Sequence, residues 1–355
     1  MAITQQPDII NCKKVAVVVL GYNSIDFLKK FLPSIVKTKY EDCTIVYVDN
    51  GSSDDSVAYV NEHLPQVEIF KILNNNGFAS GYQQSLSFIK AEYYVLINSD
   101  VAVTEDWLGH LMVEMEKDPK IGACQPKMLH EPKPEQFDYA GASGGFMDMF
   151  GYTFCRGRLF HHIEKDENQY DDVREIFWAS GACMLIKAEL FHQLGGLDEQ
   201  FFAHMEEIDL CWRVRNAGYK IIAVPKSVVY HVGGSVITYG SYSKLYHNYR
   251  NNLVMLFKNL SLGKLFLIIP MRFWLDFIAL IRAILTGNFT EWKAIHVAHF
   301  NFIFGLPKWI KSRKAARKLV NQPNLNGWYK KSLIWDVFIK GKTKFSELDY
   351  NIKKG

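Results

Sequence analysis

The feature that most constrains the fold of this 355-residue chain is a series of apolar runs that alternate with helix-like stretches. Each run is rich in β-branched or aromatic residues, which is typical of a strand buried on both faces of a parallel sheet. The alternation of strand, loop and helix predicts an α/β fold with a mostly parallel, Rossmann-like sheet and helices on both faces. The runs cover residues 15–20, 44–48, 67–72 and 93–97.

Polar or glycine-bearing loops follow these runs where each predicted strand ends. In open α/β sheets, the loops after the strands converge on one edge, and ligands bind there. We therefore expect Asp49, Gly77 and Asp100 to be neighbours. Asp100 has two interpretations from its own stretch: it could hold a metal against a phosphorylated substrate, or it could cap the helix near Glu105.

Three carboxylates stand together at Glu206, Glu207 and Asp209, at the start of a predicted helix. Negative charge is favourable in the first turn of a helix, and Asp209 can pair with Arg213 one turn later. Two phenylalanines come shortly before these acids, which capping alone does not require. The cluster is therefore also a candidate functional site.

His231 follows two predicted strands, at 219–224 and 227–230, and precedes a pair of glycines. A lone histidine at a strand end is often structural, but flanking glycines suggest that a bulky group approaches the backbone. The region 125–175 is loosely patterned and rich in proline and glycine. We expect it to carry substrate selectivity.

Charge divides the chain at about residue 240. Residues 1–239 hold 21 Lys and Arg against 32 Asp and Glu, a balance of −11, whereas residues 240–355 balance at +15. This predicts an acidic domain over 1–239 and a basic, aromatic, helical region over 240–355. The basic region could meet an anionic surface, either a membrane or a nucleic acid. No nucleic-acid-binding signature accompanies it, so we expect no nucleic acid.

The apolar stretch 265–285 holds Arg272, Asp276 and Arg282. A charge at the centre of a membrane span costs about 2.5–3.5 kcal/mol, so the stretch reads better as helices packed on the acidic domain. Aromatic residues beside lysines and arginines suit an anionic membrane surface, and a packed appendage with a solvated basic face is the open alternative.

Six scattered cysteines without a CxxC pair argue against a zinc ribbon and suggest reduced thiols. The first 11 residues lack an apolar core, so we expect no signal peptide. These features predict a cytoplasmic protein, peripheral on the inner face of the cell membrane.

Taken together, the motifs from residue 15 to about residue 252 resemble the inverting family 2 glycosyltransferases of the GT-A fold, in their bacterial rhamnosyltransferase-like branch. Their order and spacing carry the resemblance. The motifs are Val17-Val18-Val19-Leu20-Gly21-Tyr22-Asn23, Val48-Asp49-Asn50-Gly51-Ser52, Asn76-Gly77-Phe78-Ala79, Leu96-Ile97-Asn98-Ser99-Asp100, Gly181-Ala182-Cys183-Met184-Leu185-Ile186, Gly195-Gly196-Leu197-Asp198-Glu199, Glu206-Glu207-Ile208-Asp209-Leu210-Cys211-Trp212-Arg213 and His231.

The resemblance implies a nucleotide-diphosphate sugar as donor and a divalent metal, Mn²⁺ or Mg²⁺, that stabilises charge on the leaving diphosphate. Asp100 and His231 would be the metal ligands. Asn98 stands where many relatives carry Asp, so Asp100 alone supplies the charge of that motif. The residues implied in nucleotide binding are Gly21, Tyr22, Asn23, Asp49, Gly77, Asn98 and Asp100.

The resemblance also implies a carboxylate base that deprotonates the acceptor hydroxyl. The matching position is Glu207, with Glu206 as the alternative, while Asp209 would orient the helix or the sugar. The acceptor would be a glycan or a lipid-linked sugar in cell-surface polysaccharide synthesis. Two other functions stay open: a non-catalytic scaffold that binds nucleotide sugars, and a nucleic-acid-binding protein that uses the basic region.

Overall fold

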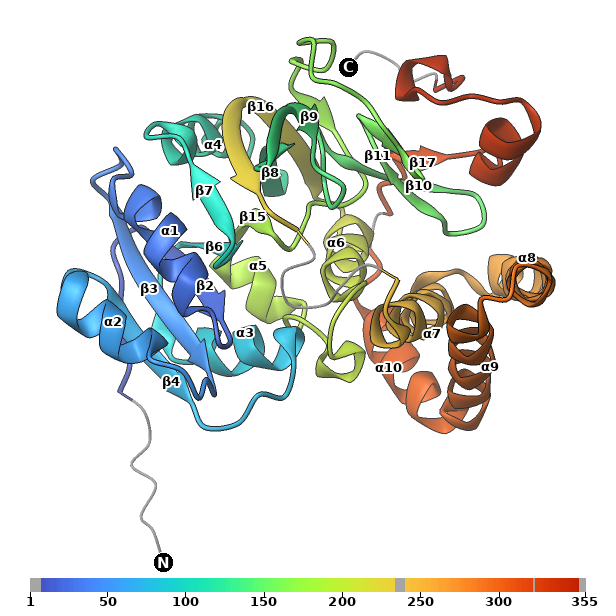
Figure 1. Ribbon diagram of the computed structural model, residues 1–355, viewed down its shortest axis with the longest axis horizontal. Helices are drawn as coiled ribbons and strands as arrows, with labels where there is room; N and C mark the ends of the chain where they lie inside the picture. Colours follow the sequence, from blue (N-terminus) through green and yellow to red (C-terminus); the bar gives the residue numbers. More distant parts are fainter. Residues whose placement is uncertain (1–7, 234–239, 322, 351–355) are drawn as a thin grey trace, which may run out of the picture.

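The computed structural model describes residues 8–233, 240–321 and 323–350. A large twisted sheet forms the centre of the molecule, and four long helices lie beside it (Figure 1). Along the main path of this sheet the strand order is β14-β16-β8-β15-β6-β2-β3-β4. These strands are β14 (Arg174–Glu175), β16 (Lys220–His231), β8 (Ile121–His130), β15 (Cys183–Lys187), β6 (Tyr93–Asn98), β2 (Val15–Gly21), β3 (Cys43–Asn50) and β4 (Glu68–Ile72).

The four predicted strands form the parallel half of this sheet. β2 pairs in parallel with β3 on one side and β6 on the other, and β4 pairs in parallel with β3. Alternate side chains of β2 enter the two halves of the core: Val17 contacts one cluster and Val18 the other. The burial of β2 on both faces explains its continuous apolar run. The predicted α/β fold is confirmed.

The other half of the sheet is mixed. β15 runs antiparallel to both β6 and β8, whereas β8 and β16 are parallel. The short strands β7 (Val101–Val103) and β9 (Lys133–Phe137) add antiparallel pairs to β16 and β8. β16 therefore brings His231 opposite Val101, next to the end of β6.

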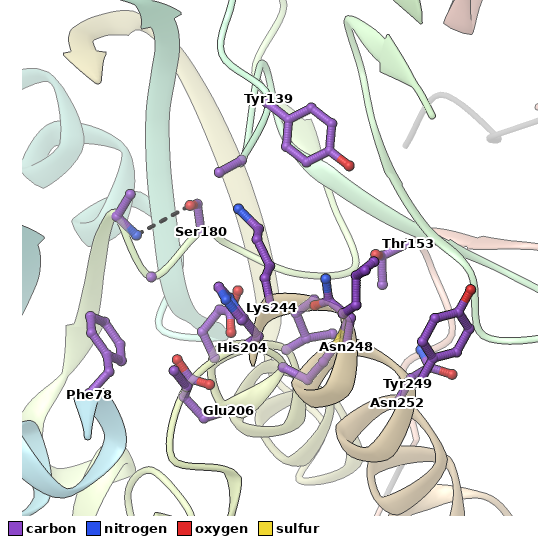
Figure 2. A pocket seen from close by; sticks show the side chains of 18 of the residues that line it. Phe78, Tyr139, Thr153, Ser180, His204, Glu206, Lys244, Asn248, Tyr249 and Asn252 are labelled. Atoms are coloured by element: carbon purple, nitrogen blue, oxygen red, sulfur yellow. Dashed lines mark hydrogen bonds between the residues drawn. The ribbon is translucent and has the colours of Figure 1, made fainter. Parts of the chain in front are cut away.

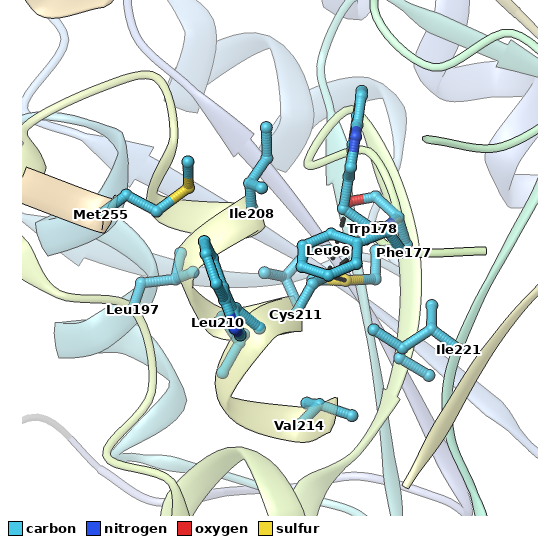
Figure 3. Close-up of a cluster of buried hydrophobic side chains, with 14 of the residues drawn as sticks. Leu96, Phe177, Trp178, Leu197, Ile208, Leu210, Cys211, Val214, Ile221 and Met255 are labelled. Carbon is cyan, nitrogen blue, oxygen red and sulfur yellow. Dashed lines mark hydrogen bonds between the residues drawn. The ribbon is translucent and has the colours of Figure 1, made fainter. Parts of the chain in front are cut away.

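Helices cover both faces, as predicted. Their buried residues separate into two clusters, one on each side of the sheet. One face carries α1 (Ile25–Val36), α2 (Ser56–His63) and α4 (Trp107–Lys117), and the other carries α3 (Phe78–Leu86), α5 (Ala188–Gln193) and α6 (Glu206–Asn216). Figure 3 shows Ile208, Leu210, Cys211 and Val214 of α6 among the buried side chains that anchor this helix.

α3 begins at Phe78, directly after Gly77, and residues 89–90 form the short strand β5 (Ile89–Lys90). One local prediction is wrong. The two strands predicted around Pro225 are the single strand β16, whose register against β8 shifts between Val224 and Val228. A shift of this kind accommodates a proline, which cannot donate a ladder hydrogen bond.

The basic region begins with a group of long helices, after which the chain returns to pair with a second sheet (Figure 1). The helices are α7 (Tyr242–Asn259), α8 (Leu262–Leu285), α9 (Phe289–Phe304) and α10 (Leu306–Lys318). A second sheet, of order β13-β12-β11-β10-β17, is completed by β17 (Trp328–Tyr329) from this region. Its other strands are β10 (Gly145–Asp148), β11 (Thr153–Cys155), β12 (Arg158–Leu159) and β13 (His162–Ile163). No helix in the described ranges is long and apolar enough to cross a membrane.

Candidate active site

A cavity of about 1000 Å³ lies between the carboxyl ends of the sheet strands, α6, α7 and α8. Figure 2 shows Phe78 at one end of it and Thr153, Tyr249 and Asn252 toward the other, with Glu206 between them. The lining combines residues of the strand-end loops, of α6 and of the C-terminal helices. The fold thus brings the predicted strand-end motifs and the acidic helix to one space.

One end of this cavity is lined by most of the residues that we expect to bind the nucleotide. They are Gly21, Tyr22, Gly77, Asn98 and Asp100. The described lining includes neither Asn23 nor Asp49. Their carboxyl and amide oxygens instead accept backbone hydrogen bonds that shape the loop after β3.

These loop contacts are specific. Asn23 Oδ1 accepts from the backbone N–H of Ser53 at 2.8 Å, and Asp49 Oδ1 accepts from that of Ser52 at 3.3 Å. Asp49 is buried. Asn23 and Asp49 therefore hold the loop between β3 and α2 against the end of β2.

A strained turn positions the acidic helix. Phe202, His204 and Met205 all have positive φ, between 66° and 74°, a conformation that costs non-glycine residues of order 1–3 kcal/mol each. Asn251 of α7, buried, holds this turn: its Nδ2 lies 3.0, 2.9 and 2.7 Å from the carbonyl oxygens of Phe201, Ala203 and His204. The turn delivers Glu206 and Glu207 into the cavity at the first turn of α6.

Both glutamates line the cavity, and their electrostatics differ. Burial raises the pKa of Glu207 to about 7. Burial and the neighbouring charge of Glu207 hold the pKa of Glu206 well above its usual range. Glu206 is therefore protonated at neutral pH, while Glu207 is poised to accept a proton.

Asp209 has a different environment from the two glutamates. It is outside the described lining and fully buried, where its carboxylate accepts from Arg213 at 3.0 Å, Lys258 at 2.9 Å and Asn259 at 2.8 Å. Burial alone would raise the pKa of Asp209, but Lys258 and Arg213 lower it. This network of ion pairs and hydrogen bonds ties α6 to α7.

His231 lies between two carboxylates. Its Nε2 is 3.4 Å from Asp100 Oδ1, and its Nδ1 is 3.2 Å from Asp138 Oδ2. Burial would lower the pKa of His231, but Asp138 and Asp100 outweigh it and raise the pKa to about 10. The strand end at 98–100 and the strand end at 231 thus meet, although 130 residues separate them.

Sequence reasoning did not find three residues of this site. Asp138 lies in the loosely patterned region, and no local motif marks it. Lys244 and Asn248 of α7 also line the cavity (Figure 2), and burial lowers the pKa of Lys244 to about 8. Their position follows from the packing of α7 against α6, which no spacing in the sequence predicts.

The fold resembles those of solved glycosyltransferases. A structure titled GalNAc-T7 with UDP, GalNAc and Mn²⁺ aligns with 69% of this chain and 48% of its own, at a TM-score of 0.54 and 17% identity. The mannosyltransferase PcManGT from Pyrobaculum calidifontis, in complex with GDP-Man and Mn²⁺, aligns with 89% of this chain and 88% of its own, at a TM-score of 0.51 and 17% identity. The architecture is therefore the GT-A fold.

The sequence profile of the family described as glycosyl transferase family 2 matches residues 16–195, so this chain belongs to that family and is a glycosyltransferase. Among curated relatives, the N-acetylglucosaminyl-diphospho-decaprenol L-rhamnosyltransferase of Mycobacterium tuberculosis is 24% identical over 231 residues, 61% of this chain and 75% of that protein. Rhamnosyltransferase WbbL of Escherichia coli is 24% identical over 223 residues, 59% of this chain and 80% of that protein. These matches confirm the resemblance to the rhamnosyltransferase-like branch.

Proposed function

We propose that this protein transfers a sugar from a nucleotide-diphosphate donor to an acceptor hydroxyl with inversion at the anomeric carbon. One observation carries the proposal: a single cavity contains the strand-end residues Asn98 and Asp100 together with the poised carboxylate of Glu207. A donor at the strand end and an acceptor on the side of α6 would then face each other across the anomeric carbon.

In this reaction the acceptor oxygen forms a bond to the anomeric carbon as the bond from that carbon to the diphosphate oxygen breaks. The acceptor proton passes to the carboxylate of Glu207, and the nucleoside diphosphate leaves with the electron pair. Glu207 suits this role better than Glu206, because a base must be ionised at working pH. Glu206, held protonated, can donate a hydrogen bond to the sugar or to the acceptor.

The residues near Asp100 fit a divalent cation such as Mn²⁺. An aspartate oxygen and a deprotonated imidazole nitrogen are ligands that Mn²⁺ accepts, so the cation would take the place of the proton that the raised pKa of His231 keeps on the ring. Asp138 lies against the other ring nitrogen of His231, as in many metal-binding histidines. The described residues contain no group of three or more His, Cys, Asp or Glu that could hold a metal, so oxygens of the donor would complete the set. When bound, the cation supplies charge stabilisation to the leaving diphosphate.

The acceptor belongs to the same proposal. The name of the Mycobacterium tuberculosis relative includes a lipid-linked sugar, N-acetylglucosaminyl-diphospho-decaprenol, and this supports a glycan or lipid-linked acceptor here. The scaffold alternative would bind the donor without transfer. The nucleic-acid alternative has less support, because acidic side chains line the cavity as well as basic ones, and acidic side chains repel phosphate groups.

The test has two stages. A panel of UDP-, dTDP- and GDP-sugars is first screened for thermal stabilisation, because a ligand that binds the folded state raises its stability. Transfer is then measured with the stabilising donor, with and without Mn²⁺ or Mg²⁺, for the wild type and Asp100→Ala. We expect metal-dependent transfer that Asp100→Ala abolishes. Equal turnover by Asp100→Ala would refute the role of Asp100, and donor binding without transfer to any acceptor would favour the scaffold.

A further inference from the structure

The cavity continues well past the acids of α6. Beyond Tyr249 and Asn252 it is bounded by α8, by the segment that follows β12 and by the π-helix Trp335–Ile339. We call this part the α8 arm. Tyr152, just before β11, and Ile334, just before the π-helix, complete its lining. The lining residues of the arm are Tyr152, Phe160, Arg272, Leu275, Asp276, Ile278, Ala279, Arg282, Ile334 and Phe338.

Apolar and cationic side chains share the α8 arm. Arg272 is 5% exposed and its guanidinium lies 3.7 Å from the ring centre of Tyr152. Its Nε is 3.2 Å from Asp276, but its buried Nη1 has no hydrogen-bond partner within the described ranges. A buried guanidinium N–H without a partner is costly, so this atom points to a ligand with acceptor oxygens.

α8 also has the reverse of the usual amphipathic pattern. Its buried side includes Arg272 and Asp276, whereas large apolar side chains are exposed. A surface helix in water normally places apolar residues inward. Ile278, 49% exposed, belongs both to the cavity lining and to this exposed apolar face, which continues through Trp274, Ile281 and Leu285. The arm therefore opens onto an apolar surface.

We propose that the α8 arm is the acceptor site and that its occupant is a phosphate-bearing lipid, with the phosphate at Arg272 and the hydrocarbon chain along Ile278 and Phe338. This inference rests on the proposed function, because it places the acceptor on the side of Glu207 away from the donor. Guanidinium groups bind phosphate oxygens through paired hydrogen bonds, and the apolar wall removes the chain from water. A free sugar or a soluble glycan would leave both features unused.

The test uses the full chain with the best-stabilising nucleotide present at saturation. Calorimetry compares farnesyl diphosphate below its micelle concentration with inorganic diphosphate and with farnesol. We expect farnesyl diphosphate to bind while the nucleotide stays bound, and each half-ligand to bind at least about tenfold more weakly. Displacement of the nucleotide, or equal binding of inorganic diphosphate, would overturn the proposal.

Variants locate the site. Ile278→Ser with Phe338→Ser changes two half-exposed residues, so folding is retained, and we expect farnesyl diphosphate to bind about tenfold more weakly. Val113→Ser on α4 is the matched control, because Val113 is 59% exposed and outside the described lining. Arg272→Lys keeps the charge but loses the paired donors, and it should weaken diphosphate-dependent binding.

The outcomes separate this inference from the proposed function. If the double variant and Val113→Ser bind farnesyl diphosphate equally, or if the wild type does not bind it, the acceptor site is wrong even though nucleotide binding persists. If no nucleotide sugar of the panel binds or is consumed, the proposed function itself fails.

Discussion

At the scale of single residues, the environments of the adjacent Glu206 and Glu207 give their carboxyl groups different tendencies to ionise. Glu207 is less buried than Glu206, and burial raises its pKa to about 7. Burial and the charge of Glu207 both disfavour the ionised form of Glu206 and hold its pKa well above the usual range, since two adjacent carboxylates in a buried site resist ionising together. In the proposed reaction, Glu207 is therefore the proton acceptor.

The first prediction is a pH profile. A base must be deprotonated, so kcat/KM should fall as pH drops through about 7, well above the range of an ordinary glutamate. Glu206→Gln removes a group that is already protonated and should keep this acidic limb near the same pH. An acidic limb near pH 4.5 in the wild type, or its loss in Glu206→Gln, would show that Glu207 is not the titrating base.

The second prediction concerns Gly77, the residue before α3. Its φ is +97°, and a Cβ there would lie 2.6 Å from the ring of Phe202. Gly77→Ala should therefore lower the free energy of unfolding by at least about 1 kcal/mol and weaken nucleotide binding. Gly109→Ala is the control: Gly109 lies in the first turn of α4, and its Cβ would meet nothing within 4 Å, so the change should be neutral or stabilising. Denaturant titration measures both, and equal effects would contradict the account.

At the scale of elements, α7 holds the turn that precedes Glu206 and Glu207. Asn251 Nδ2 donates to three carbonyl oxygens of that turn, including that of Phe201. Arg250 Nη2 donates to the same carbonyl of Phe201 at 3.1 Å and to that of Gln200 at 3.0 Å. The positive φ values of the turn persist because these contacts fix it. The start of α6 is therefore set by a helix outside the matched family region.

The third prediction follows from this clamp. Asn251→Ala should cost about 1–3 kcal/mol of stability and should lower kcat more than it raises the KM for the donor, because the glutamates lose their position. Asn288→Ala is a control for stability alone: it removes the cap of α9, at about 1 kcal/mol, away from the cavity. If both variants keep wild-type kcat, the clamp has no catalytic role.

Much of the site could be predicted from the sequence, because each strand can be recognised from its own apolar run. The apolar runs fix β2, β3, β4 and β6, and parallel pairing then brings the strand-end residues to one edge. Asp138 and Arg272 could not be found in this way. Each acquires its role only when distant segments pack, Asp138 against His231 and Arg272 against Tyr152.

At the scale of the whole molecule, contact with a membrane stays a prediction from the basic, aromatic C-terminal region. Its described helices expose many large apolar side chains, such as Phe266, Leu267 and Phe304, beside lysines and arginines. Exposing such a large apolar surface to water is unfavourable, whereas an anionic bilayer offers both hydrocarbon and negative charge.

The fourth prediction is that the protein co-sediments with anionic vesicles more than with neutral ones, and less at high salt. Phe266→Ser with Leu267→Ser should reduce binding by at least about tenfold, because each side chain contributes about 1.5–3 kcal/mol when buried in lipid. Leu73→Ser, 82% exposed and in the catalytic domain, should have no effect. Equal sedimentation of all three proteins would leave α8 without a role at the membrane.

In the proposed reaction, Glu207 takes the proton of the acceptor hydroxyl in a cavity that also holds the donor. The most direct test of this role is single-turnover sugar transfer by the wild type and Glu207→Gln, with the nucleotide affinity of each measured in parallel. We expect the transfer rate of Glu207→Gln to be about 10²–10⁴-fold lower than that of the wild type, with nearly unchanged nucleotide affinity. Wild-type transfer by Glu207→Gln would contradict it.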